Sequence, residues 1–382
     1  MKKSVIWLAL MLVCMWMFPV VSNTASASDK NLKISAKSAY LVDYYSGQVV
    51  YEKKADERLP VASMTKLASL AVIFDYMQKG IVKENDEVVV SKTAAAVGGS
   101  SAYLDHGSRY KVTDLIKTVI MASANDSTVA LAEHIAGTED VFVSKMNKFV
   151  EDLELENTHF SNATGLPCEN HYSSAKDMAK IYQTVCDNVL YKKYSKIWID
   201  SFMHPSGRKT NLVNTNRLVK TYDGIEGGKT GFTNNARFCL TASAKRGNMR
   251  LVGVVIGVDD SKTRFKEMSN LFDYGFSNYK NVNVASAEIP VTIAKFKNAK
   301  KQVEVYPKND LVKFLSKTDE NEFSTDYQIF EIKAPIKSET VVGRLYVFDK
   351  NNMVVDEIDL ILKSDVDEIG FKEKLSKFVK AW

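Results

Sequence analysis

The sequence predicts a mixed α/β domain with a helical insertion, followed by a small all-β domain. Strand-like runs stand on both sides of a block of helical runs, at residues 34–51 and 238–258, which is typical of a sheet covered by helices. After about residue 282, only short strand-like runs remain, separated by turn and charge clusters. The chain of 382 residues is long enough for two domains, and its 45% hydrophobic and 25% charged residues are typical of globular proteins.

The predicted elements follow in order along the chain. Alternating polarity and a Ser-Gly turn predict a β-hairpin over residues 34–51. A near-continuous apolar run predicts that the strand at 251–258, which follows one at 238–244, is central in its sheet. Helical spacing predicts helices over residues 64–78, 112–121, 127–135, 141–153, 174–185 and 264–274. The second domain shows strand-like runs at residues 288–293, 302–306, 312–314, 328–332, 341–348 and 354–362.

The first 27 residues have the pattern of a secretory signal peptide. Lys2 and Lys3 precede an apolar run over residues 4–21, and the Ala-Ser-Ala sequence at residues 25–27 fits a cleavage site. An uncleaved membrane anchor is the alternative, because the 18 residues of the apolar run are at the lower edge of a spanning length. We therefore expect an exported protein, for which ATP- and NAD-dependent chemistry is disfavoured.

Charge and cysteine content exclude several classes of protein. The net charge of +5 falls by two, to about +3, without the leader, and so small a charge does not suggest a nucleic-acid-binding face. The cysteines beyond the leader, Cys168, Cys186 and Cys239, show no metal-binding or Cys-x-x-Cys spacing. The five histidines show no ligand spacing either. We therefore expect no metal, no cofactor and no nucleic-acid partner.

The last twelve residues have one apolar helical face, made by Phe371, Leu375, Phe378, Val379 and Trp382. Four lysines lie elsewhere around the predicted helix. A helix that is aromatic on one side and basic on the other is typical of a membrane interface. We therefore expect this segment to bind the outer face of the cytoplasmic membrane. A terminal helix docked on the β domain is the alternative.

Ser63 and Lys66 form the first candidate for chemistry. They are three residues apart at the start of the first long predicted helix, so they share a face. A serine near a helix N-terminus meets free N–H groups that favour a developing anion. A nearby lysine can act as a base if burial or another cation lowers its pKa. The same Ser-x-x-Lys spacing recurs at residues 173–176 and 206–209, where a helix cap and a turn are the simpler interpretations.

Two further triplets make the pattern specific. Ser-Ala-Asn at residues 123–125 stands 60 residues after Ser63, between two predicted helices, and Lys-Thr-Gly at residues 229–231 occurs once in the chain. Alone, the first triplet is explained by a helix cap and the second by a turn. A phosphate-binding loop ending in Gly-Lys-Thr is excluded because it needs a glycine where this chain has Asp223.

With these three motifs in this order, the chain resembles the penicillin-binding-protein and serine β-lactamase superfamily, and within it the low-molecular-weight D-alanyl-D-alanine carboxypeptidases. The stretches 60–66, 121–126, 162–166 and 228–233 fit that group. The resemblance implies a transpeptidase-like fold with a central antiparallel sheet and a helical subdomain. It divides the chain into a signal peptide (1–27), a catalytic domain (28–282), a β-rich domain (283–364) and an amphipathic membrane-associating helix (365–382).

The resemblance also implies the roles of the catalytic residues. Ser63 would attack the carbonyl between two D-alanines of a peptidoglycan stem peptide, and Lys66 would take its proton. An acyl-enzyme forms as the terminal D-alanine leaves, with Ser123 relaying a proton to the leaving amine. Asn125 would hold the substrate amide, and Lys229 would supply positive charge that lowers the pKa of Lys66. β-Lactam antibiotics are expected to acylate the same serine.

The remaining candidate residues are expected to bind substrate. Thr230 would form a hydrogen bond to it, and the backbone N–H groups of Ser63 and of Phe232, which follows Gly231, would form an oxyanion hole. Arg264, within a Ser-Lys-Thr-Arg-Phe sequence, resembles the family's carboxylate-binding arginine. A surface arginine is the alternative for Arg264.

Rival functions differ in what they require of the chain. A class A β-lactamase shares the fold and the motifs but carries Glu-x-x-Leu-Asn, whereas the comparable residues 154–157 read Glu-Leu-Glu-Asn. A DD-endopeptidase would use the same residues to cut cross-links. A wall-binding protein with an inactive site is the alternative from another class, and the complete set of serine and lysine motifs argues against it.

Overall fold

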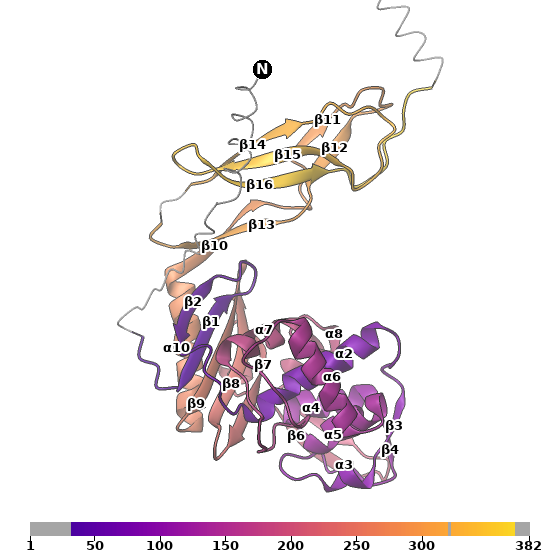
Figure 1. The fold of residues 1–382 in the computed structure, drawn as a ribbon, viewed down its shortest axis with the longest axis vertical. Helices are drawn as coiled ribbons and strands as arrows, with labels where there is room; N and C mark the ends of the chain where they lie inside the picture. The colour runs from indigo at the N-terminus through magenta and orange to yellow at the C-terminus, as the bar shows by residue number, and fades with distance from the viewer. Residues whose placement is uncertain (1–31, 320–321, 371–382) are drawn as a thin grey trace, which may run out of the picture.

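The computed structural model describes residues 32–319 and 322–370. The predicted leader and residues 371–382 of the predicted tail lie outside this range. The larger domain is built on a five-stranded antiparallel sheet with the order β2-β1-β9-β8-β7 (Figure 1). Its strands are β1 (Ser38–Asp43), β2 (Val49–Lys53), β7 (Ile225–Thr233), β8 (Arg237–Arg246) and β9 (Met249–Val258).

Strand β9 lies in the middle of this sheet, as its apolar run predicted, and all of its residues are buried. Helix α10 (Ser261–Asn278) packs on one face, where Leu251 shares a core with Met268 and Phe272. Strands β1 and β2 pair as the predicted hairpin. The prediction of a mixed α/β domain around a central sheet is therefore confirmed.

The helical block covers the other face of the sheet (Figure 1). There Val252 and Val254 of β9 share a second core with helical residues such as Leu70 and Ile120. The remaining predicted helices are present as α2 (Lys66–Gln78), α4 (Val112–Ala122), α5 (Asn125–Ala136), α6 (Glu139–Asp152) and α7 (Ala175–Val185). A short 3-10 turn, η1 (Ala62–Thr65), precedes α2.

Several short elements were not predicted from the sequence. The two-stranded sheets β3–β4 and β5–β6 are short and half-exposed, so their strands lack an apolar run. The unpredicted elements are β3 (Glu87–Val89), α3 (Lys92–Ala96), β4 (Arg109–Lys111), α8 (Val189–Ser195), β5 (Ile199–Met203), β6 (Lys209–Val213) and α9 (Leu218–Thr221).

The turn considered for residues 229–231 is instead part of strand β7. Glycines usually weaken a strand, but two of those in β7 lie where another segment comes close. A Cβ at Gly228 would lie 2.6 Å from the Thr241 carbonyl oxygen, and one at Gly231 would lie 2.6 Å from the Val61 carbonyl oxygen. The glycines therefore reflect close packing of β7 against its neighbours.

The second domain is all-β, as predicted. One sheet has the order β11-β12-β16-β15-β14, and β10 pairs with β13 beside it. Val305, Val342, Leu345 and Leu360 belong to its core. The strands are β10 (Tyr279–Ala285), β11 (Thr292–Ala294), β12 (Val303–Pro307), β13 (Leu311–Ser316), β14 (Ser324–Ile329), β15 (Val341–Phe348) and β16 (Val354–Ile361).

The structure corrects three details of this domain. Strand β10 runs across the predicted division at 282/283 because it pairs with β13. Val366 bridges to Ile336, and both Val366 and Ile369 are buried, so residues 365–370 contact the β domain instead of opening a tail helix. The strand expected at 288–293 is present only as β11. Within the described ranges, no helix is long and apolar enough to cross a bilayer.

Candidate active site

Ser63 and Lys66 are brought together where the chain enters helix α2. Ser63 lies in the turn η1, and Lys66 is the first residue of α2. Lys66 Nζ lies 3.0 Å from Ser63 Oγ and 2.6 Å from the carbonyl oxygen of Thr164. The Lys66 side chain is fully buried. The predicted serine and lysine therefore share a face and are in hydrogen-bond contact.

Ser123 and Lys229 form a second serine–lysine contact. Ser123 ends α4 in the left-handed conformation, with φ of 61°. This conformation is uncommon outside glycine and often marks a functional turn. Lys229, on β7, is buried and donates to Ser123 Oγ at 2.8 Å and to the Thr230 carbonyl oxygen at 2.9 Å. The second and third sequence motifs therefore meet directly.

Asn125 is the first residue of α5, and a neighbouring loop holds it in place. Its Nδ2 donates to the Gly98 carbonyl oxygen at 2.6 Å, whereas its Oδ1 is buried and has no hydrogen-bond partner in the described residues. The adjacent Asp126 carboxylate accepts from the N–H groups of Ala102 and Leu104, both at 3.0 Å. The loop at 98–104 is thus fixed to the start of α5, and Asn125 keeps one free acceptor.

The end of strand β7 lies directly against the turn that carries Ser63. A Cβ at Gly231 would lie 3.3 Å from the Ser63 backbone nitrogen. Phe232 follows at the free edge of the sheet, with its ring half-exposed and packed on Phe238 at a centroid distance of 4.4 Å. The backbone of β7 therefore borders Ser63 on an open sheet edge.

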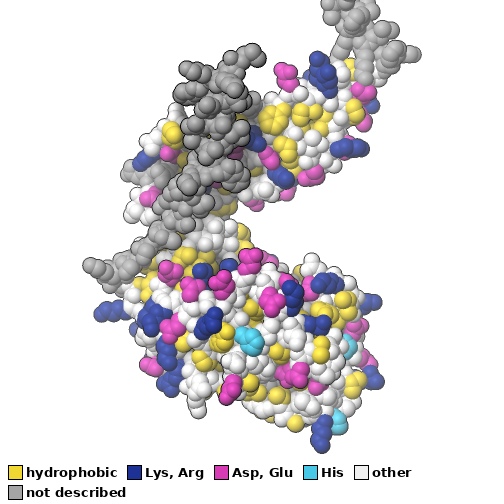
Figure 2. All heavy atoms as spheres, in the orientation of Figure 1, with side chains coloured by type: hydrophobic (Ala, Val, Ile, Leu, Met, Phe, Trp, Pro, Cys, Tyr) yellow, Lys and Arg dark blue, Asp and Glu magenta, His cyan; other side chains and the backbone are white. Residues whose placement is uncertain are grey.

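Two buried lysines dominate the electrostatics of the site. Burial, and then the charge of Lys229, hold the pKa of Lys66 well below its ordinary value, and Asp126 opposes this shift. Burial and the charge of Arg264 lower the pKa of Lys229 to about 7. The surface of the larger domain is not dominated by one sign of charge. Figure 2 shows positive and negative side chains interspersed over the face in view. The lowered pKa makes the neutral amine of Lys66 more accessible than that of an exposed lysine.

Arg264 lies in the first turn of α10, and its side chain extends from there to strand β7. It is buried, and its Nη1 donates to the carbonyl oxygens of Gly231 and Cys239 at 3.2 and 3.3 Å. Its Nε has no hydrogen-bond partner in the described part of the chain. Arg264 also lines a cavity of about 540 Å³ together with Arg217 and Lys220. The surface-arginine alternative is therefore wrong, and the guanidinium lies beside the Lys-Thr-Gly motif.

The sequence interpretation missed two groups that hold these residues. The Thr164 carbonyl oxygen contacts Lys66, and the Asp126 carboxylate fixes the loop beside Asn125. A backbone carbonyl has no side-chain signature, so no residue type could have indicated the first. Asp126 directly follows Asn125, and a buried acid at the start of a helix could have been suspected from that place.

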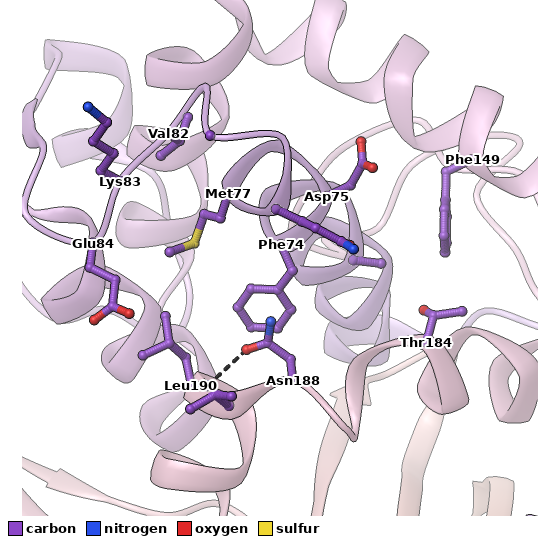
Figure 3. Close-up of a pocket in the computed structure, with 14 residues that line it drawn as sticks. Phe74, Asp75, Met77, Val82, Lys83, Glu84, Phe149, Thr184, Asn188 and Leu190 are labelled. Atoms are coloured by element: carbon purple, nitrogen blue, oxygen red, sulfur yellow. Dashed lines mark hydrogen bonds between the residues drawn. The ribbon is translucent and has the colours of Figure 1, made fainter. Parts of the chain in front are cut away.

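A larger cavity elsewhere in the domain is separate from this site. It has a volume of about 760 Å³ and is lined by the far end of α2, including Phe74 and Met77, together with Phe149 and Leu190 (Figure 3). Helix α2 has 13 residues and is therefore about 20 Å long, with Ser63 at its opposite end. Among the described residues, no group of three or more His, Cys, Asp or Glu could hold a metal ion.

Comparison with known proteins agrees with this geometry. Residues 23–260 match the family described as D-alanyl-D-alanine carboxypeptidase, peptidase S11, and residues 279–368 match the penicillin-binding protein 5 C-terminal domain. The chain is 37% identical to D-alanyl-D-alanine carboxypeptidase DacF of Bacillus subtilis over 350 residues, which cover 91% of this chain and 90% of that one. It is 32% identical to DacA of Escherichia coli over 382 aligned residues, covering 94% and 92%.

Solved structures show the same relationship. Penicillin-binding protein 5 from Haemophilus influenzae superimposes with a TM-score of 0.71 and 30% identity, covering 88% of this chain and 98% of that one. A Streptomyces K15 DD-transpeptidase covers 64% of this chain with a TM-score of 0.60 and 26% identity. The transpeptidase-like fold predicted for the larger domain is therefore confirmed. The chain belongs to the peptidase S11 family of D-alanyl-D-alanine carboxypeptidases, enzymes of peptidoglycan metabolism.

Proposed function

We propose that Ser63 is the nucleophile and Lys66 the general base in removal of the terminal D-alanine from peptidoglycan pentapeptides. The observation that carries this assignment is the 3.0 Å contact between Ser63 Oγ and a fully buried Lys66 Nζ. The lowered pKa of Lys66 supports it, because a base must be neutral to accept a proton. The Lys66 amine takes the hydroxyl proton as Ser63 Oγ bonds to the penultimate D-alanyl carbonyl carbon.

The acyl-enzyme forms when the amide C–N bond breaks. Ser123, which accepts a hydrogen bond from Lys229 at 2.8 Å, passes its hydroxyl proton to the departing amine nitrogen and is reprotonated by the Lys66 ammonium, so D-alanine leaves as the neutral amine. Water then adds to the ester carbonyl as the neutral Lys66 amine takes its proton, and Lys66 returns that proton to Ser63 Oγ as the ester bond breaks and the shortened peptide leaves. β-Lactams acylate Ser63 in the same first step, because their strained amide replaces the scissile bond.

The edge of β7 is the proposed substrate platform. Thr230 and the backbone around Gly231 would hold an extended peptide, and the N–H groups of Ser63 and Phe232 would bind the developing oxyanion. Asn125 supports this arrangement with its buried, unpartnered Oδ1, which can accept from a substrate amide. Arg264, with its unpartnered Nε beside β7, is the proposed reader of the terminal carboxylate.

We also propose that the protein is exported and acts at the outer face of the cytoplasmic membrane. The signal-peptide pattern at residues 1–27 and the amphipathic pattern at residues 371–382 support this location. The proposed division keeps a catalytic domain and a β-rich domain, with the second extended to residue 370 because Val366 and Ile369 are buried.

The nucleophile is tested with a fluorescent penicillin and a pentapeptide muropeptide. Ser63→Ala should lose covalent labelling and release of D-alanine while keeping its melting temperature. Ser173→Ala is the matched control, since Ser173 begins another Ser-x-x-Lys sequence but is buried against Thr158 Oγ1 at 2.7 Å. Labelling that persists in Ser63→Ala would overturn the assignment. Mass spectrometry that shows cleavage of cross-links instead of loss of one D-alanine would indicate an endopeptidase.

A further inference from the structure

We propose that His171 is a positioning residue for Lys66, which it serves by holding the loop at 161–165 against the turn that carries Ser63. The inference rests on the roles proposed above for Ser63 and Lys66. His171 does not touch the reacting atoms. It acts through Thr65, one of the two residues between Ser63 and Lys66, which has no role in the proposed mechanism.

The contacts of His171 fix both its tautomer and its orientation. Its Nδ1 accepts a hydrogen bond from the Ser161 backbone N–H at 3.1 Å, so the ring proton of the neutral imidazole is on Nε2. That nitrogen lies 2.8 Å from Thr65 Oγ1 and donates to it. The ring is buried against Phe160, and burial lowers the pKa of His171 to about 4. The imidazole is therefore neutral near neutral pH and joins the loop to the turn.

The loop at 161–165, which His171 holds in place, contacts the start of α2 at several points. Ser69 Oγ donates to the Ala163 carbonyl oxygen at 2.6 Å, and Lys66 Nζ donates to the Thr164 carbonyl oxygen at 2.6 Å. Gly165 packs so closely that a Cβ there would overlap the Ala62 carbonyl oxygen and lie 2.9 Å from Thr65 Oγ1. The loop backbone thus covers Lys66 with no side chain between them.

The contact with the Thr164 carbonyl oxygen determines how the Lys66 amine is oriented. A neutral amine has one lone pair and two N–H bonds. When one N–H points at the Thr164 carbonyl oxygen, the lone pair can point at the Ser63 hydroxyl, 3.0 Å away. After proton transfer, the ammonium keeps the same carbonyl as an acceptor. A loop that moves away loses this orientation and admits water to a side chain that is otherwise fully buried.

The test measures the rate of acylation by a penicillin as a function of pH in the full chain. His171→Leu and Thr65→Val should each slow acylation roughly 10- to 100-fold, the usual cost of small misplacement. The acid limb of the pH profile should also move to higher pH, because burial is the largest cause of the low Lys66 pKa. The double variant should be no slower than either single one, since both remove the same contact.

His171→Gln separates a positioning role from a packing role. Its amide oxygen can accept from Ser161 and its amide nitrogen can donate to Thr65, so it should restore most of the rate and the parental acid limb. His204→Leu is the matched control. His204 is also buried and has hydrogen-bond contacts at both ring nitrogens, with Tyr110 and Thr210, so this variant should lose stability and keep the acid limb.

Two results would overturn the proposal: a parental acid limb in Thr65→Val, or a His171→Gln enzyme as slow as His171→Leu. If His171→Leu does not fold, Thr65→Val and His171→Gln decide the matter on their own. Labelling of Ser63 in the unchanged chain tests the proposed function separately. If the unchanged chain is acylated normally and none of the three substitutions alters the acylation rate or the acid limb, only the role proposed for His171 is wrong.

Discussion

Lys229 Nζ lies 2.8 Å from Ser123 Oγ, although 106 residues separate the two in the chain. This contact joins strand β7 to the turn between α4 and α5, and it parallels the 3.0 Å contact of Lys66 with Ser63. The two lysines are both buried, and each lies close enough to another cation to lower its pKa. The site therefore holds two serine–lysine pairs, for which we propose different chemical tasks.

Arginine substitutions should separate those tasks. Lys66→Arg keeps a positive charge but removes the neutral amine, because arginine does not deprotonate in proteins. Acylation by penicillin should then fall by roughly 10²- to 10⁴-fold, the usual contribution of a general base. Lys229→Arg keeps the positive field beside Ser123 and should retain part of the rate. Rates of labelling measure both, and equal losses would mean that Lys66 serves only as a charge.

The pH profile of acylation should be bell-shaped. Lys66 must be neutral, so the rate falls as pH drops through its lowered pKa. Lys229 must be charged, so the rate also falls as pH rises through its pKa of about 7. In Lys229→Arg the alkaline limb should disappear while the acid limb stays, because the guanidinium keeps its proton. An alkaline limb that is the same in both proteins would assign it to another group.

Gly231 should tolerate no side chain. A methyl group there would lie 2.6 Å from the Val61 carbonyl oxygen and 3.3 Å from the Ser63 backbone nitrogen. Gly231→Ala should therefore cost about 1–3 kcal/mol of stability and push β7 away from Ser63, with loss of penicillin labelling.

Gly275→Ala is the control for overpacking at Gly231. Its Cβ would lie 2.5 Å from a side-chain atom of Leu251, in the core beneath α10. It should lower the melting temperature and leave labelling intact. Equal labelling by the two variants would show that β7 does not need its close approach to Ser63.

The parts of the site that the sequence predicted are those where chemistry demands a particular side chain. The chemistry assigned to Ser63, Lys66 and Lys229 needs a hydroxyl, an amine and a charge, so residue type and spacing indicated them. The Thr164 carbonyl was missed because every residue has one, and only the fold decides which carbonyl reaches Lys66.

The fold was predictable to the same degree and for a related reason. Strand β9 was predicted because it is buried on both faces, which leaves an apolar run. Strand β7 was not, because its glycines allow close approach to Thr241 of the neighbouring strand β8 and to Val61, and the contact with Val61 joins parts of the chain that are distant in the sequence. The short two-stranded sheets β3–β4 and β5–β6 are half-exposed, so the apolar pattern of their strands is too weak to predict them.

The end of the chain offers a test of membrane attachment in which the cut must fall after Gly370. A chain that ends at Ser364 loses Val366 and Ile369, which are buried in the β domain, and about 1.5–3 kcal/mol of stabilisation for each. A chain that ends at Gly370 keeps both and loses only the aromatic and basic segment at 371–382. It should therefore keep its melting temperature and penicillin labelling, yet no longer sediment with anionic vesicles.

The uncut mature protein should sediment, and high salt should release part of it, because salt screens the attraction between the lysines and the anionic lipids. Vesicle binding that survives the cut at Gly370 would place the attachment elsewhere, with an uncleaved leader at residues 4–21 as the next candidate.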